Sequence, residues 1–372
     1  MEYTSVKVII PLYHEELSKS ERISLMQCKK VLNRYPLCII KPQNLFLQPE
    51  ITEGMEIEEF EEKWFQSVCS YNNLMLSEIF YRKFTDCEYI LIYQLDAFVF
   101  KDELEKFCAL GYDYIGAPWL YGQFAYMNGK GRYYYVGNGG LSLRRVKSHL
   151  DVLQRYKIET GIMEDVFFSS RDELRVAPIE VALCFAFETN VRKCFARNNE
   201  QLPFGCHAWH KYDFKFYRKI IREAGYDTGG IVDEEWDQKK FNNLRDLSQL
   251  PEDGLKKTLK SLLLDIKDEI WIWGAGQIGK ECGWQMLKNH ISISGFIDNN
   301  IQLQGTKLFG VKIVSQQQYL HDRRGVPLII AISCVPEEIE SWLCLNDLQE
   351  GRDYISWKTL YKCLGDKLEI FK

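Results

Sequence analysis

The hydrophobic pattern of the chain alternates between strand-like and helix-like segments from its first residues. Residues 6–13 (VKVIIPLY) and 36–45 (PLCIIKPQNL) are short apolar runs that each contain a proline near the end, and residues 18–35 between them are helix-like. A continuous β-branched run is typical of a parallel strand that is buried on both faces. The chain therefore opens as strand, helix, strand, which predicts an α/β fold.

An apolar and aromatic run at 89–100 (YILIYQLDAFVF) contains one carboxylate, Asp96. A predicted helix at 64–84 precedes it, and the acidic stretch 50–63 predicts a loop or an exposed helix. Burying an isolated charge is costly unless a partner charge, hydrogen bonds or a metal compensates for it. Functional groups of open α/β sheets gather just past the carboxyl ends of the strands, so Asp96 is a candidate functional residue.

Shorter elements follow in the first half of the chain. Residues 112–122 and 131–145 predict short strands interrupted by glycines, and a helix is expected around residues 145–156. The apolar stretch 179–195 is ambiguous between strand and helix.

A second α/β series begins near residue 267. Residues 269–290 predict a strand, a glycine-rich turn and a helix, and the next strand ends at Asp298. A further strand is expected at 327–333 and a helix at 336–348, with Pro336 at its start. The predicted organisation is a first domain at 1–236, a partly helical linker at 237–266 and a small Rossmann-like α/β domain at 267–372.

Composition excludes several classes of protein. Of the 372 residues 46% are hydrophobic and 27% charged, and 47 Lys plus Arg against 52 Asp plus Glu give no reason to expect nucleic-acid binding. No apolar run is long enough to span a membrane, which leaves peripheral membrane contact and oligomer formation open. The twelve cysteines lack regular spacing and predict reduced thiols in the cytoplasm. Cys206, His207 and His210 lack the second ligand pair of a structural zinc site.

Four short motifs succeed one another: QLD at 94–96, GNGG at 137–140, MED at 163–165 and HAWH at 207–210. In this order, with the phrases IGAPW and PFGCHAW, they resemble the GT-A glycosyltransferases, and a bacterial group of glycosyltransferase-like proteins classed as a domain of unknown function. The resemblance covers roughly residues 5 to 225. It implies a GT-A-type mixed, mostly parallel sheet flanked by helices, and transfer of a sugar from a nucleotide-diphosphate sugar, UDP-linked in the first instance, to a hydroxyl of a glycan or lipid-linked acceptor.

The resemblance also implies roles for individual residues. Asp96 and His207 would hold Mn²⁺ or Mg²⁺, which would stabilise the leaving diphosphate as a Lewis acid. Gln94 stands where the family usually has another acid, so it would bond ribose or a metal-bound water, and a metal-independent reaction stays open. Asp165, with Glu164 beside it, maps onto the general base of an inverting transfer. Alternatively, both acids simply favour the first turn of a helix.

The remaining site predictions rest on position. Gly139 and Gly140 would let the donor approach the backbone, although a hairpin turn explains them equally well. The residues placed at the nucleobase by resemblance are Pro11, Tyr13 and His14. Trp119 and Trp209 are suggested to contact the acceptor sugar with the flat faces of their rings, although most aromatic residues belong to the hydrophobic core.

Gly274, Gly276 and Gly279 form a second glycine-rich loop, a G-x-G-x-x-G arrangement between strand and helix with Asp298 downstream. It resembles the small modules attached to sugar acyltransferases and methyltransferases, and predicts a second nucleotide site. Because only one of the two usual mononucleotide halves is visible, a scaffold role competes. The alternatives to a glycosyltransferase are an NAD-dependent oxidoreductase that uses this loop and a non-catalytic sugar-nucleotide sensor. Sugar nucleotidyltransferases rank last, because their loop after the first strand is missing.

Overall fold

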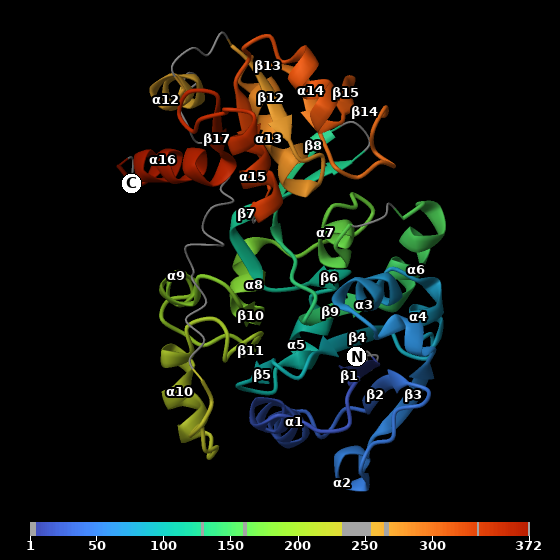
Figure 1. Cartoon of the computed structure of the whole chain (residues 1–372). Coiled ribbons are helices and arrows are strands. Elements are labelled where there is room, and N and C mark those ends of the chain that lie inside the picture. Colours follow the sequence, from blue (N-terminus) through green and yellow to red (C-terminus); the bar gives the residue numbers. More distant parts are fainter. Residues whose placement is uncertain are drawn as a thin grey trace. The chain divides into compact units, whose positions relative to one another are not determined.

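The chain folds into two compact units, which are coloured along the sequence in Figure 1. Unit 1 comprises Met1–Gln123 and Tyr134–Lys240, and unit 2 comprises Phe124–Tyr133 and Phe241–Lys372. The computed structural model describes residues 5–127, 130–158, 162–232, 254–263, 268–332 and 335–370. The segment 124–133 thus belongs to the second unit, although the sequence places it within the predicted first domain. Most of the predicted linker lies outside the described residues.

Unit 1 is built on a six-stranded sheet with the strand order β3-β2-β1-β4-β9-β6. The first four of these strands are parallel, whereas β9 runs antiparallel to both β4 and β6. This arrangement is the mixed, mostly parallel sheet that was predicted. The bounds are β1 Val6–Pro11, β2 Leu37–Pro42, β3 Glu56–Phe60, β4 Tyr89–Tyr93, β6 Tyr114–Ile115 and β9 Leu141–Arg145.

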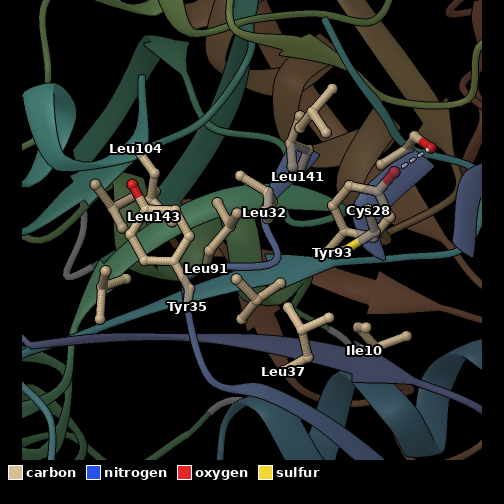
Figure 2. Close-up of a cluster of buried hydrophobic side chains, with 14 of the residues drawn as sticks. Ile10, Cys28, Leu32, Tyr35, Leu37, Leu91, Tyr93, Leu104, Leu141 and Leu143 are labelled. Atoms are coloured by element: carbon tan, nitrogen blue, oxygen red, sulfur yellow. Dashed lines mark hydrogen bonds between the residues drawn. The ribbon is translucent and has the colours of Figure 1, made fainter. Parts of the chain in front are cut away.

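Apolar side chains cover both faces of this sheet, which explains the continuous hydrophobic runs. Along β4, Leu91 and Tyr93 point into one core cluster and Ile90 and Ile92 into another, as the two-residue period of a strand requires. The first cluster is shown in Figure 2. The hydroxyl of Tyr93 lies within hydrogen-bond distance of the backbone carbonyls of Ser24 (2.9 Å) and Ala97 (3.0 Å). Helices α1 (Lys19–Val31) and α5 (Leu104–Ala109) contribute to this side.

The opposite face is covered by four short helices: α3 Val68–Met75, α4 Glu78–Arg82, α6 Val146–Arg155 and α7 Glu164–Ser169. The acidic stretch before them differs from the prediction. It forms α2 (Pro49–Thr52), the edge strand β3 and the turn η1 (Glu62–Trp64). An edge strand tolerates charges because one side faces solvent, and Lys41 and Lys83 pair with the acids of β3.

The run YILIYQLDAFVF is two strands rather than one. After β4 the chain turns, with the Ala97 N–H donating to the Gln94 carbonyl (2.8 Å), and continues as β5 (Phe98–Val99). β5 joins a small sheet in the order β10-β11-β5, with β10 Ala186–Phe187 and β11 Gly205–Cys206. The ambiguous stretch 179–195 resolves into α8 (Ile179–Phe185), β10 and the start of α9 (Val191–Arg197).

A helix and part of a hairpin complete unit 1. Helix α10 (Phe214–Glu223) follows the small sheet. Strands β7 (Pro118–Met127) and β8 (Lys130–Val136) pair as a hairpin, whose outer segment 124–133 is the part that belongs to unit 2.

Unit 2 contains a six-stranded sheet in the order β14-β15-β13-β12-β16-β17, so β12, the first of these strands in the sequence, lies near the centre. Its strands are parallel except β14, which runs antiparallel to β15. The predicted alternation of strand and helix is therefore present, and the predicted fold class is confirmed for the whole chain. The strand bounds are β12 Glu269–Trp273, β13 Ser292–Ile297, β14 Lys307–Leu308, β15 Val311–Val314, β16 Leu328–Ile330 and β17 Tyr354–Ser356.

Helices lie on both faces of this second sheet (Figure 1). Those that contribute to one core cluster are α12 Gly254–Leu262, α13 Gln277–Lys288 and α16 Trp357–Ile370. Those that contribute to the other are α14 Gln316–Asp322 and α15 Glu337–Leu345. Because α12 is part of this core, the end of the predicted linker belongs to unit 2. Among the described residues, no helix combines the length and apolar character that crossing a bilayer requires.

Candidate functional site

Asp96 lies in the turn directly after β4, at the carboxyl end of a parallel strand, as the sequence predicted. Its Oδ1 lies 2.9 Å from Nε2 of His207, and its Oδ2 accepts a hydrogen bond of 2.8 Å from Nζ of Lys211. Burial works against the charge of this carboxyl, but these two neighbours outweigh burial and hold the pKa of Asp96 well below its usual range. The buried carboxylate is therefore compensated by two basic side chains.

His207 connects Asp96 to a second buried acid. The residue follows β11, and its Nδ1 lies 2.9 Å from Oε1 of Glu188, which follows β10. The other carboxylate oxygen of Glu188 accepts a hydrogen bond of 2.5 Å from Nδ2 of Asn138. The result is a chain of hydrogen bonds and ion pairs that runs from Asn138 through Glu188, His207 and Asp96 to Lys211.

The predicted metal ligands Asp96 and His207 are adjacent, but they do not fit a divalent ion in this arrangement. A metal needs a lone pair on the imidazole ring, and here each ring nitrogen faces a carboxylate. Burial opposes a charge on His207, yet Asp96 and Glu188 raise its pKa to about 10. Across the described part of the chain, no group of three or more His, Cys, Asp or Glu residues is arranged to hold a metal. Cys206, considered for zinc, is fully buried in the core of unit 1.

The GNGG segment between β8 and β9 contacts the other three motifs. The Gln94 N–H donates to the Gly140 carbonyl (2.9 Å). A Cβ added at Gly140 would overlap the ring of His207, and one added at Gly139 would overlap the carboxylate of Glu164. The protein's own side chains therefore explain both glycines, and neither residue lines the cavity described below. Their predicted contact with the donor stays a prediction.

Glu164 and Asp165 open helix α7, so both acids lie in its first turn. Glu164 is buried and receives both terminal nitrogens of Arg144 at 2.9 Å, an arrangement typical of a fork-like ion pair. Because the first N–H groups of a helix have no acceptor within the helix, the Glu164 backbone N–H donates instead to Oδ1 of Asn72 (2.6 Å). Arg144 also donates to the Gly139 carbonyl (3.3 Å) and to the hydroxyl of Tyr81 (3.0 Å). Glu164 therefore fixes the glycine segment beside α7.

Among the described residues, no basic side chain pairs with Asp165 in this way, and its Oδ1 accepts a hydrogen bond from the neighbouring Val166 N–H (2.7 Å). Burial, followed by the charges of Glu164 and Glu188, raises its pKa to about 7, against the weaker effect of Arg144. A carboxyl with a pKa near neutrality can accept a proton from a hydroxyl group at that pH. Of the two predicted acids, Asp165 is thus the one whose environment suits a general base.

A cavity of about 570 Å³ lies at the carboxyl ends of β1 and β4. Its wall includes five residues that the sequence assigned to the donor: Pro11, Tyr13, His14, Gln94 and Asp96. Leu95 of the QLD motif and His210 of the HAWH motif also line it. The residues that the sequence did not single out are Leu12, Ser18, Ser20, Glu21, Phe65, Gln66, Ser67, Val68, Tyr71 and Lys211. Parallel strands thus place these side chains at one edge, as the fold class predicts.

The cavity adjoins the acidic motif through Tyr71. This residue is part of helix α3, lines the cavity, and directly precedes Asn72, which bonds the start of α7. Burial raises the pKa of Tyr71, and its hydroxyl also interacts with the charges of Arg144 and Glu164. Two of the four motifs therefore line the cavity, through Gln94, Leu95, Asp96 and His210, whereas no residue of GNGG or MED is part of its wall.

Two other predictions fare differently. The ring of Trp209 is fully buried, and its Nε1 donates to Oγ of Ser24 (2.9 Å), so the predicted acceptor contact is wrong for this residue. It is a core side chain, as the competing interpretation held. Trp119 is half-buried against Gly137 and lies outside the cavity wall, so its role stays a prediction.

The second glycine-rich loop occupies the turn between β12 and α13. Gly274 has a positive φ of 106°, and a Cβ on Gly279 would overlap the Gly274 carbonyl, so the turn requires both residues. Gly276 has open space where a Cβ would be. Asp298, proposed for ribose, accepts the N–H groups of Ala275 (2.8 Å) and Asn300 (2.9 Å) and so holds the loop itself. A nucleotide at this loop stays a prediction.

Sequence reasoning missed three charged residues of the site: Glu188, Lys211 and Arg144. One signal was available for Glu188, because it follows the apolar run ALCFAF as Asp96 follows YILIYQL. Glu188 and Asp96 share this pattern, a single acid at the end of an apolar run. Lys211 and Arg144 carry no comparable signal, since single basic residues beside polar segments are usually solvated.

A family model described as "Protein of unknown function (DUF5672)" matches residues 54–207, which include three of the four motifs in full and the first residue of HAWH. No curated protein matches the sequence.

Among solved structures, the galactosyltransferase LgtC in complex with donor and acceptor sugar analogues is 12% identical, with 62% of this chain and 99% of that chain covered and a TM-score of 0.40. The glycosyltransferase GlyE of Streptococcus pneumoniae is 11% identical over 95% of this chain and 91% of its own, with a TM-score of 0.34. The bifunctional glycosyltransferase WbbM is 11% identical over 56% and 46%, with a TM-score of 0.36. Similarity at this level does not establish an activity for this chain.

Proposed function

We propose that the chain transfers a sugar from a nucleotide-diphosphate sugar, UDP-linked in the first instance, to a hydroxyl of a glycan or lipid-linked acceptor in bacterial glycan or polysaccharide synthesis. The observation that carries this proposal is the composition of one cavity wall. It combines the aromatic side chains of Tyr13 and His14, several hydroxyl and amide groups, and the Asp96–Lys211 pair.

These groups match what a nucleotide sugar needs. Tyr13 is 58% exposed, so its ring is accessible to a nucleobase. Ser18, Ser67 and Gln66 offer hydrogen bonds suited to ribose and sugar hydroxyls. The cavity volume of about 570 Å³ lies within the range of roughly 300–1,000 Å³ that small-molecule sites occupy.

Asp165 is the proposed general base. It accepts the proton of the acceptor hydroxyl while the hydroxyl oxygen attacks the anomeric carbon. The bond between that carbon and the diphosphate oxygen breaks, and the diphosphate leaves with the electron pair. A single base is enough for this direct displacement, which inverts the configuration.

The direct test is a thermal-shift panel of UDP, GDP, ADP and TDP sugars, followed by assays for release of the nucleotide diphosphate. We expect one nucleotide class to stabilise the protein selectively and its sugar to be hydrolysed slowly or transferred. Binding without turnover over hours would favour the sensor alternative. A change in nicotinamide fluorescence on adding the protein to NADH, with no effect of any sugar nucleotide, would favour the oxidoreductase.

A further inference from the structure

Lys211 brings a positive charge to Asp96, the residue that the sequence predicted as a ligand of a divalent metal. It lies in the turn after β11, and its ammonium group is 2.8 Å from Oδ2 of Asp96. Both residues line the cavity, and the Lys211 side chain is 40% exposed, whereas that of Asp96 is 15% exposed. The Lys211 side chain is therefore bound to Asp96 and also partly exposed at the cavity wall.

The carboxylate that holds this ammonium group is itself held in place by other buried side chains. Asp96 is held on its other oxygen by His207, and His207 is held by Glu188, which in turn binds Asn138. A lysine side chain is otherwise long and flexible. Anchoring its charge before the substrate binds removes part of the reorganisation that would accompany the reaction.

A nucleotide diphosphate in this cavity would meet a carboxylate of the same sign. Repulsion from Asp96 is avoided only if a cation lies between the carboxylate and the phosphate oxygens. Oδ2 of Asp96 already contacts Lys211, and Oδ1 lies against His207. Gln94, the nearby residue of the same motif, is uncharged and brings its Oε1 to 3.2 Å from Nε2 of His207. A divalent ion bound to Asp96 and His207 would have to break these contacts.

We propose that Lys211, held by Asp96, supplies the positive charge that stabilises the leaving diphosphate, so that sugar transfer proceeds without a divalent metal. This inference rests on the proposed function. As the bond from the anomeric carbon to the diphosphate breaks, negative charge grows on the departing oxygen, and the ammonium group stabilises it. Lys211 keeps its protons throughout, and the proton of the acceptor hydroxyl passes to Asp165.

The experiment measures turnover of the sugar nucleotide selected by the thermal-shift panel, with EDTA and with added Mn²⁺ or Mg²⁺. Wild-type protein is expected to turn over equally well in EDTA. Lys211→Met is expected to lower kcat by about a hundredfold or more, the usual effect of losing one preorganised group that stabilises transition-state charge. Lys219→Met is the matched control, because Lys219 is 84% exposed on α10 and lies outside the cavity wall, and it is expected to keep full activity.

A conservative variant separates charge from folding. Lys211→Arg keeps the positive charge and is expected to retain more activity than Lys211→Met, while thermal unfolding shows whether each variant is folded. Wild-type turnover that disappears in EDTA and returns with Mn²⁺ would overturn the inference and leave the proposed function intact. So would full activity of a folded Lys211→Met. If wild-type protein turns over none of the sugar nucleotides, with or without metal, the proposed function itself fails and the inference fails with it.

Discussion

At the scale of single residues, Asp165 is the proposed general base, and we expect its protonation to set how the proposed reaction depends on pH. Burial and the charge of Glu164 raise its pKa to about 7. A general base acts only when it is deprotonated. The raised pKa therefore moves the onset of activity from the acidic range of an ordinary aspartate to near neutrality.

We expect kcat/KM for sugar transfer to rise with pH and to level off above about 7, where the Asp165 carboxyl loses its proton. Asp165→Asn removes the base and is expected to lower kcat by about 10²–10⁴-fold and to abolish this rise. Asp151→Asn, on the exposed face of α6, is the control. An unchanged pH profile in Asp165→Asn would show that another group controls the rise.

Glu188 is expected to matter for stability as well as for the site. Glu188→Ala would leave the His207 ring and the Asn138 amide without their shared buried acceptor. Removing one partner of a buried charged pair costs about 3–5 kcal/mol of unfolding free energy. Urea unfolding measures this loss, with Glu180→Ala on the exposed face of α8 as control. Equal unfolding midpoints for the two variants would contradict the buried role of Glu188.

The sequence located the acids better than it located their partners. Asp96 was visible because an apolar run predicts burial and a charge within it demands an explanation. The side chains that compensate the charge of Asp96, Lys211 and His207, lie more than a hundred positions away in the sequence. Only the folded sheet, which brings the ends of β4 and β11 together, identifies which basic residues are used.

At the scale of elements, hydrophobic periodicity predicted what is buried and failed where an element is polar. β1, β2, β4, α1 and α13 were expected from their apolar patterns, whereas β3 was missed. Its sequence, EIEEF, has the acidic composition of a loop. It becomes a strand because it pairs with β2 at the edge of the sheet, where Lys41 supplies a charge partner. Such pairing depends on tertiary structure rather than on local preference.

The loop between β12 and α13 allows a matched comparison of two glycines. Gly279→Ala would place a Cβ against the Gly274 carbonyl, and such overpacking costs about 1–3 kcal/mol of stability. Gly276→Ala has open space and an ordinary φ of −74°, so we expect a stability change within about 1 kcal/mol. Chemical unfolding of both variants checks this difference. Similar losses would show that the open space at Gly276 is filled in solution.

At the scale of the whole molecule, the outer segment of the β7–β8 hairpin belongs to the core of unit 2 although it is far from it in sequence. The Tyr133 hydroxyl donates to Glu281 (2.7 Å) and accepts from Gln285 (2.7 Å), and both partners lie on α13. Nothing in the local pattern of the hairpin predicts these contacts, because the residues are separated by about 150 positions. The predicted domains are therefore continuous stretches of sequence, whereas each compact unit is made of two separate segments.

We therefore expect Tyr133→Phe to destabilise unit 2, although Tyr133 belongs to the first half of the sequence. Glu281 is buried and also accepts a hydrogen bond from the Tyr361 hydroxyl (3.0 Å), so Tyr133→Phe removes one donor from a buried carboxylate, at a cost of about 1–3 kcal/mol. Hydrogen exchange followed by mass spectrometry is expected to show faster exchange in α13 and α16, with β1 and β4 unchanged. Faster exchange confined to β1 and β4 would place the hairpin in the core of unit 1 instead. Because the measurement reads each unit separately, it tests the division of the chain directly.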